Sequence, residues 1–252
     1  MKRTIVILFA GVVVFSACKK TTEKLRQLTS FTVVNATTDI TTAKAYAADH
    51  EIAWSTLPTT ENVLQYASNH YTALAGAILV KTVNAADTTK VLFASTGKTE
   101  VLEEAKLSTL FLAGNTTAGY EGILLKNEDL PLYSDSVMGI RYINLVPGST
   151  GLNVTLSTST TVNEAANLNY KQITDFKTYP ALQSTAAITF QVRDAANVLL
   201  GSFILPYTPP GSGNYRTSAI PFARFKNLTL VIKGAIGGTG ANVIGIFPVP
   251  HY

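Results

Sequence analysis

The sequence predicts an all-β protein built from two tandem β-sandwiches. Three observations lead to this prediction: apolar residues alternate with a period of two, turn residues interrupt the chain at short intervals, and the pattern of the first half returns in the second. The composition agrees, because 46% of the 252 residues are hydrophobic and only 14% are charged, which excludes a disordered chain. The formal net charge of +4 is too small for the basic footprint of a nucleic-acid-binding protein.

The first eighteen residues predict a lipoprotein signal peptide. Two basic residues and an apolar run are followed by the small pair Ser16-Ala17 and by Cys18, the only cysteine of the chain. The run is shorter than the roughly 20 apolar residues that a membrane-spanning helix needs, and it has the length of a signal-peptide core. The pattern resembles a bacterial lipobox, which implies cleavage of residues 1–17 and acylation of Cys18. An ordinary secretory signal with a cysteine nearby by chance is the alternative.

The residues after the cysteine predict a tether and a location. Residues 18–28 are polar enough to act as a flexible tether behind the lipid. Lys19, which follows the cysteine, resembles the sorting pattern of outer-membrane lipoproteins in diderm bacteria. We therefore expect an outer-membrane, lipid-anchored protein, and the sequence leaves open whether it faces the periplasm or the cell surface.

Strand-like segments recur in the same order in both halves of the chain. The matched segments are residues 31–35 with 140–144, 83–87 with 193–197, 91–95 with 198–202, 107–114 with 227–234, and 122–125 with 245–248. They predict a first sandwich domain over residues 29–133 and a second over residues 137–252. Residues 60–68 and 99–106 are the only windows that favour short helices.

Several of these segments carry a resemblance to a known family. Asn35 and Asn144 at the ends of matched strands, the segment Asn-Tyr-Lys-Gln-Ile-Thr-Asp-Phe at 169–176, and the strand region 188–200 resemble the bacterial family called domain of unknown function 4397. The resemblance extends over residues 29–250 and is stronger in the second repeat. It implies tandem immunoglobulin-like sandwiches in a lipoprotein, and the family has no settled activity to carry over.

The sequence offers no convincing catalytic or metal-binding motif. The three histidines are far apart, and Asp49-His50-Glu51, the densest cluster, is better explained as a solvated loop. Gly211-Ser212-Gly213 lacks the spacing of a nucleophile elbow. Residues 237–242 are glycine-rich, but a strand-like segment follows them where a dinucleotide-binding loop needs a helix. We therefore expect no catalytic residues, no metal and no cofactor.

One loop distinguishes the two repeats. Fourteen positions separate Ser95 from Thr109 (109 minus 95), whereas 27 separate Ser202 from Thr229 (229 minus 202), so the second repeat contains about 13 extra residues. Loops on rigid scaffolds often carry recognition, and Tyr and Arg are favoured contact residues. The candidate contacts to a glycan or protein partner are Tyr207, Asn214, Tyr215 and Arg216. A tolerated surface connection is the alternative.

Aromatic residues of the first repeat give a second candidate surface. Trp54, Tyr46, Tyr66 and Tyr71 could stack on a sugar, although such residues more often belong to a core. Two short segments, Asp87-Thr88-Thr89 and Asp135-Ser136-Val137, also resemble an O-glycosylation motif of some diderm bacteria.

These observations favour a non-enzymatic outer-membrane lipoprotein that acts as a binding or scaffolding module of the cell envelope. A surface glycan-binding or adhesion protein is one alternative, and an extracytoplasmic hydrolase is another. The expected partners are the membrane, through acylated Cys18, and a glycan or an envelope protein. Nucleic acid is not expected.

Overall fold

The computed structural model describes residues 27–62, 68–182, 185–205 and 223–251. Within these residues the fold is all-β, as predicted, and helical structure is limited to short 3-10 turns such as η1 (Trp54–Thr56) and η3 (Gly240–Asn242). No helix in this part of the chain is long and apolar enough to cross a membrane. The predicted signal peptide, Cys18 and most of the predicted tether lie outside the described residues.

The first sandwich consists of two sheets. One has the strand order β4-β1-β8-β9 and the other the order β3-β2-β5-β6, with β7 paired to β5. The strands are β1 (Leu28–Asn35), β2 (Thr42–Ala48), β3 (Thr59–Glu61), β4 (Ser68–Leu74), β5 (Gly76–Asn84), β6 (Val91–Ala94), β7 (Glu100–Leu102), β8 (Leu107–Asn115) and β9 (Gly119–Glu128).

The second sandwich repeats this arrangement. Its sheets have the orders β13-β10-β16-β17 and β12-β11-β14-β15. The strands are β10 (Val137–Asn144), β11 (Leu152–Leu156), β12 (Ser159–Leu168), β13 (Lys177–Pro180), β14 (Ile188–Arg193), β15 (Leu199–Leu205), β16 (Asn227–Lys233) and β17 (Gly245–His251). The first strand of each sandwich lies inside its sheet, where β1 pairs in parallel with β8, and β10 with β16. This order differs from that of an immunoglobulin constant domain, whose first strand lies beside the second.

Strand registers show which residues of the two repeats are equivalent. Phe31 pairs with Ser108 in the first sandwich as Ile140 pairs with Leu228 in the second, which agrees with two of the matched sequence segments. The match of segment 122–125 with 245–248 is wrong by one residue. Gly122 pairs with Leu112 and Ile246 pairs with Ile232, and Leu112 and Ile232 are equivalent, so Gly122 corresponds to Ile246. A slip of one residue in a strand exchanges its two faces, and apolar residues on both faces of β17 concealed the slip.

The asparagine that ends the first strand of each sandwich has a clear local role. The Asn35 side chain accepts a hydrogen bond from the Thr37 backbone N–H at 3.2 Å and donates one to the Ile40 carbonyl at 3.1 Å. Asn144 does the same with the Val146 N–H at 3.0 Å and with the Leu168 carbonyl at 2.8 Å. A buried asparagine can satisfy both a donor and an acceptor of the chain where it leaves the sheet, which explains why each strand ends in this residue.

The two helical predictions are not supported. In the window 99–106, residues 100–102 form strand β7. In the window 60–68, residues 60 and 61 belong to strand β3, and residues 63–67 lie outside the described residues. In both places the chain pairs with a neighbouring strand, β5 or β2, and this tertiary pairing outweighs the weak helical preference of short polar segments.

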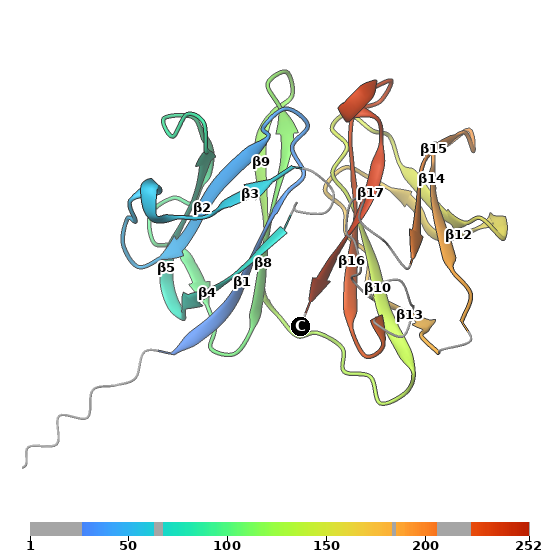
Figure 1. Cartoon of the computed structure of the whole chain (residues 1–252), viewed down its shortest axis with the longest axis horizontal. Helices are drawn as coiled ribbons and strands as arrows, with labels where there is room; N and C mark the ends of the chain where they lie inside the picture. Colours follow the sequence, from blue (N-terminus) through green and yellow to red (C-terminus); the bar gives the residue numbers. More distant parts are fainter. Residues whose placement is uncertain (1–26, 63–67, 183–184, 206–222, 252) are drawn as a thin grey trace, which may run out of the picture.

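The two sandwiches stand side by side, so that four sheets follow one another across the molecule (Figure 1). Each sandwich has its own apolar core between its two sheets, which is centred on Phe31, Leu110 and Val80 in the first and on Tyr142, Phe190 and Leu230 in the second. A third apolar cluster lies between the inner sheets of the two sandwiches. We call this contact, between the sheet that contains β1 and the sheet that contains β10, the seam.

Candidate functional site

The seam has an apolar centre that both sandwiches build from equivalent positions. Its buried residues are Val34, Ala36, Phe111, Ala113, Ile143, Leu145, Val231, Phe247 and Val249, with Ile123, Leu125, Tyr170 and Ile173 packed around them. Val34 and Ile143 hold the same place in their strands, as do Phe111 and Val231. The inner sheets are therefore apolar on both faces, which is why their central strands are buried along almost their whole length.

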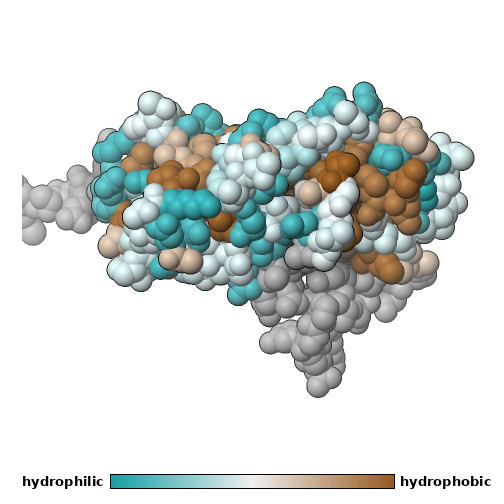
Figure 2. All heavy atoms as spheres, turned by 90° about the horizontal axis from the view of Figure 1, so that it is seen from above, coloured by the Kyte–Doolittle hydropathy of each residue, from teal (hydrophilic) through white to brown (hydrophobic). Residues whose placement is uncertain are grey.

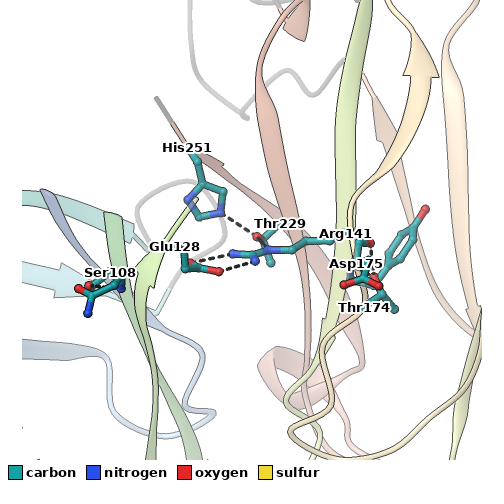
Figure 3. Close-up of polar contacts among 9 residues, drawn as sticks. Ser108, Glu128, Arg141, Thr174, Asp175, Thr229 and His251 are labelled. Atoms are coloured by element: carbon teal, nitrogen blue, oxygen red, sulfur yellow. Dashed lines mark hydrogen bonds and ion pairs between the residues drawn. The ribbon is translucent and has the colours of Figure 1, made fainter. Parts of the chain in front are cut away.

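A buried ion pair lies in the seam beside this cluster (Figure 3). The Arg141 guanidinium of β10 donates to both carboxylate oxygens of Glu128 on β9, at 2.5 and 3.1 Å. The Arg141 side chain is only 8% exposed and that of Glu128 only 15%. The guanidinium also lies 4.5 Å from the ring of Phe176. A bidentate pair of this kind fixes both the distance and the orientation of the two sheets.

A β-bulge places Glu128 in the seam. The pairing of β8 with β9 shifts by one residue between Leu107 and Thr109, and Asn127 adopts a left-handed backbone conformation with φ of 55°. Its N–H is bonded to the Ser108 hydroxyl at 3.1 Å. The extra residue reverses the side to which the following side chain points, so the bulge turns Glu128 toward Arg141.

A threonine and a histidine extend the polar row from the ion pair. Arg141 Nε donates to the Thr229 hydroxyl at 2.8 Å, and the Thr229 hydroxyl lies 2.7 Å from Nε2 of His251. The Thr229 hydroxyl and Nε2 of His251 share one hydrogen bond, and the buried Nδ1 of His251 has no hydrogen-bond partner among the described residues. Burial, with the charge of Arg141 and the neighbouring His70, lowers the pKa of His251 to about 3. His251 is therefore neutral at physiological pH.

A buried lysine crosses the seam at another point. The Lys233 ammonium group, at the end of β16, donates to the carbonyl oxygens of Thr37, at 3.5 Å, and Asn62, both in the first sandwich. The residue is 6% exposed, and burial lowers its pKa to about 8. The seam thus contains charged groups whose contacts run from one sandwich to the other, and this arrangement is suited to holding the sandwiches together.

A small pocket lies at the open side of the first sandwich. It has a volume of about 100 Å³ and is lined by Phe31, Val33, Ala45, Tyr46, Ala47, Ile52, Leu57, Tyr71, Thr72 and Ala73. Ligand pockets usually have volumes of about 300–1,000 Å³, so this pocket has room for one apolar group or ring at most.

Three of the four aromatic residues singled out in the first repeat are described, and they separate into two environments. Tyr71 packs against the core of the first sandwich. Tyr46 lies on the outer face of its sheet, where the half-buried Trp54 covers it with ring centroids 5.0 Å apart. The Lys81 ammonium group is 5.9 Å from the Trp54 ring, and Lys44 donates to the Trp54 carbonyl at 2.7 Å. Tyr66 lies outside the described residues.

The remaining predicted positions are partly visible. His50 Nδ1 lies 2.6 Å from Asp49 in an exposed segment, and no group of metal-binding residues is found among the described residues. Thr88 is exposed in the turn between β5 and β6, whereas Ser136 is half-buried. The predicted partner-binding loop, with Tyr207, Asn214, Tyr215 and Arg216, lies outside the described residues, as does Cys18.

Sequence reasoning missed the polar groups of the seam, although a signal was present. Arg141 and Lys233 are charged residues within strands that are otherwise apolar, and the first repeat has Thr32 and Ala113 at the equivalent positions. A charge inside a buried strand requires a partner. The sequence could have predicted the need for a partner but not its identity.

The chain matches no protein-family model and no curated protein sequence. Among solved structures, it is similar to a crystal structure of a "putative adhesin" from Bacteroides ovatus. The identity is 9%, the TM-score is 0.25, and the match covers 89% of this chain and 95% of that one.

Proposed function

We propose that the protein is a lipid-anchored module of the bacterial cell envelope that binds or holds a partner and does not catalyse a reaction. The observation that supports this proposal is the seam. An apolar cluster, a bidentate ion pair and a buried lysine all connect the two sandwiches. The two sandwiches therefore form one rigid platform. Rigid platforms suit binding and spacing, because their loops keep fixed relative positions.

The anchor part of the proposal rests on Cys18 and is tested by intact mass. Expression in a diderm bacterium is expected to yield a chain that begins at Cys18 and carries the mass of its acyl groups. Cys18→Ala is expected to remove that mass and to release the protein from the membrane fraction. A wild-type chain without acyl mass would contradict the anchor.

Accessibility on intact cells tests where the module acts. A tagged protein is probed with protease and antibody before and after lysis. Access on intact cells supports a surface role, and protection until lysis supports a periplasmic scaffold. An enzymatic activity on an envelope substrate that co-purifies with the protein would overturn the proposal.

A glycan-binding or adhesion role is the second candidate, and the stack of Trp54 on Tyr46 beside Lys81 favours it. A half-buried tryptophan with a neighbouring ammonium group offers an apolar ring face and a hydrogen-bond donor, both of which suit a sugar. Glycan-array binding is expected to be lost in Trp54→Ala and retained in the matched control Trp54→Phe. Equal binding by both variants would exclude this face.

A further inference from the structure

The connection between the two sandwiches presents a leucine to solvent in a fixed position. Leu132 is 96% exposed, the highest value among the exposed large apolar residues that the structure describes. Its two neighbours are both held by one buried side chain: Asn227 donates to the Pro131 carbonyl at 2.8 Å and accepts from the Tyr133 hydroxyl at 3.1 Å. The exposure of Leu132 is therefore built into the fold.

A phenylalanine of the second sandwich is also held with its side chain exposed. Phe225 is 50% exposed and has a left-handed backbone with φ of 62°, which is unusual for a bulky residue. Its N–H donates to the Val137 carbonyl at 2.8 Å, which holds this conformation. The neighbouring Arg224 donates to the carbonyl of Ala181, next to the half-exposed Leu182, at 3.4 Å.

These residues lie at the end of the molecule where the chain enters the first sandwich. Strands β1 and β10 both begin at this end, which is the lower one in Figure 1. Leu28, the first residue of β1, is 53% exposed there. We call this end of the molecule, which carries the exposed Leu28, Leu132, Leu182 and Phe225, the tethered end.

We propose that the tethered end docks on the lipid bilayer that holds the acyl chains of Cys18, with Leu132 and Phe225 inserted among the headgroups. This inference rests on the lipid anchoring proposed above. Ten residues lead from Cys18 to Leu28, and a fully extended chain of that length spans at most about 36 Å. The anchor thus keeps the tethered end near the bilayer, and exposed apolar side chains in such a position favour the interface.

The described residues of the tethered end carry charges of both signs. Arg224 and Lys226 flank Phe225, whereas Glu103 and Glu104 lie in the turn beside Leu28 and Asp135 lies in the connection between the sandwiches. Residues 19–26 of the tether add four basic side chains and one acidic side chain, so phosphatidylglycerol is expected to strengthen binding to the vesicle. The insertion of Leu132 is expected to depend on its apolar side chain and to change little with this lipid.

The opposite end of the molecule provides a matched control. Figure 2 shows that apolar residues also gather at that end, over the second sandwich. Exposed apolar side chains of the hairpins there are Val198, Leu199, Ile236 and Val243. Val243 is 50% exposed, like Phe225, but lies in the connection that joins the end of β16 to the start of β17, at the other end of these strands.

The test uses full-length acylated protein in vesicles of phosphatidylethanolamine and phosphatidylcholine. Because acylation occupies the only native cysteine, Leu132→Cys and Val243→Cys each provide a single thiol for an environment-sensitive fluorophore. A lipid-borne quencher is expected to quench the label at position 132 several-fold more strongly than the label at 243. Adding Phe225→Asp to Leu132→Cys is expected to reduce this quenching. The unfolding midpoint of the double variant, compared with that of Leu132→Cys, checks that the fold is retained.

Each other outcome identifies what failed. Vesicle-bound protein with both labels in water overturns the docking and leaves the anchor intact. A chain without acyl mass that does not bind vesicles overturns the anchor and the docking with it. The label at position 132 could instead be shielded from water without being quenched by the lipid-borne quencher, with shielding that increases with protein density. That result would assign the surface to a contact with a second copy and overturn lipid docking.

Discussion

The two faces that meet in the seam are built from equivalent positions, yet they are chemically different. At its centre, apolar residues occupy matching places, as with Val34 and Ile143. At its margins, the second sandwich has Arg141 and Lys233 where the first has the small residues Thr32 and Ala113. Long cationic side chains on one face and small residues on the other allow two equivalent sheets to pack closely without facing like charges. The positions that are alike in the two repeats form the apolar centre, and the positions that differ form the specific polar contacts.

Truncation at the apolar centre is expected to have the largest effect. Phe111 and Val231 are fully buried at equivalent places, so Phe111→Ala should lower the free energy of unfolding by about 4 kcal/mol and Val231→Ala by about 2 kcal/mol. Urea denaturation measures both values. Equal losses would show that the two faces do not contribute according to the area that each buries.

Breaking the ion pair on one side is expected to cost slightly less than Phe111→Ala. Arg141→Met leaves Glu128 buried without its partner, which should lower the free energy of unfolding by about 3 kcal/mol. Combining it with Glu128→Gln should restore part of this loss, because the uncompensated charge is then removed. If the single and double variants proved equally unstable, the pair would act through packing alone.

Lys233 should make stability depend on pH. Its pKa is about 8 in the folded protein against 10.5 for an unperturbed lysine, so between these values the unfolded chain binds more protons, and the free energy of unfolding rises with pH. From pH 8 to 9.5 the gain should be about 2 kcal/mol relative to Lys233→Met, which lacks the titrating group.

The comparison with Lys233→Met separates the lysine from the tyrosines. Burial and the nearby Glu121 raise the pKa of Tyr170 to about 12, and burial raises that of Tyr142 further. Stability from these groups is lost as pH rises above about 10, where tyrosines of the unfolded chain ionise. Parallel stability curves for the wild type and the variant below pH 9.5 would contradict the assignment to Lys233.

The smallest effect is expected at the exposed edge of the seam. Lys171 of the second sandwich pairs with Glu121 of the first, but their side chains are 42% and 40% exposed. Solvent screens such pairs, so Lys171→Ala should change the free energy of unfolding by less than about 0.5 kcal/mol. A loss as large as that of Arg141→Met would mean that burial is not what distinguishes the two cross-seam pairs.

Much of the fold could be predicted because local patterns carry it. The alternation of apolar residues predicted the sandwiches, and the recurrence of segments such as 107–114 in 227–234 predicted the matching central strands. Two short strands, β3 and β7, fall in windows that the sequence predicts as helical, because three-residue strands have no periodicity of their own and exist only through pairing with β2 or β5. The sequence predicts that the aromatic residues of the first repeat form either a core or a binding face. Only the structure separates Tyr71 in the core from Tyr46 under Trp54.

The all-β class, the repetition of strands and the asparagine that ends each first strand follow from the amino-acid sequence, because they depend on neighbours along the chain. The seam, in contrast, is visible only once the two sandwiches are packed together. Periodicity shows that a strand has a buried face but not what covers it. A bulge at Asn127 is needed to bring Glu128 to Arg141, and Lys233 meets the Asn62 carbonyl 171 residues away. Such contacts depend on how two finished sheets pack together, which no local pattern encodes.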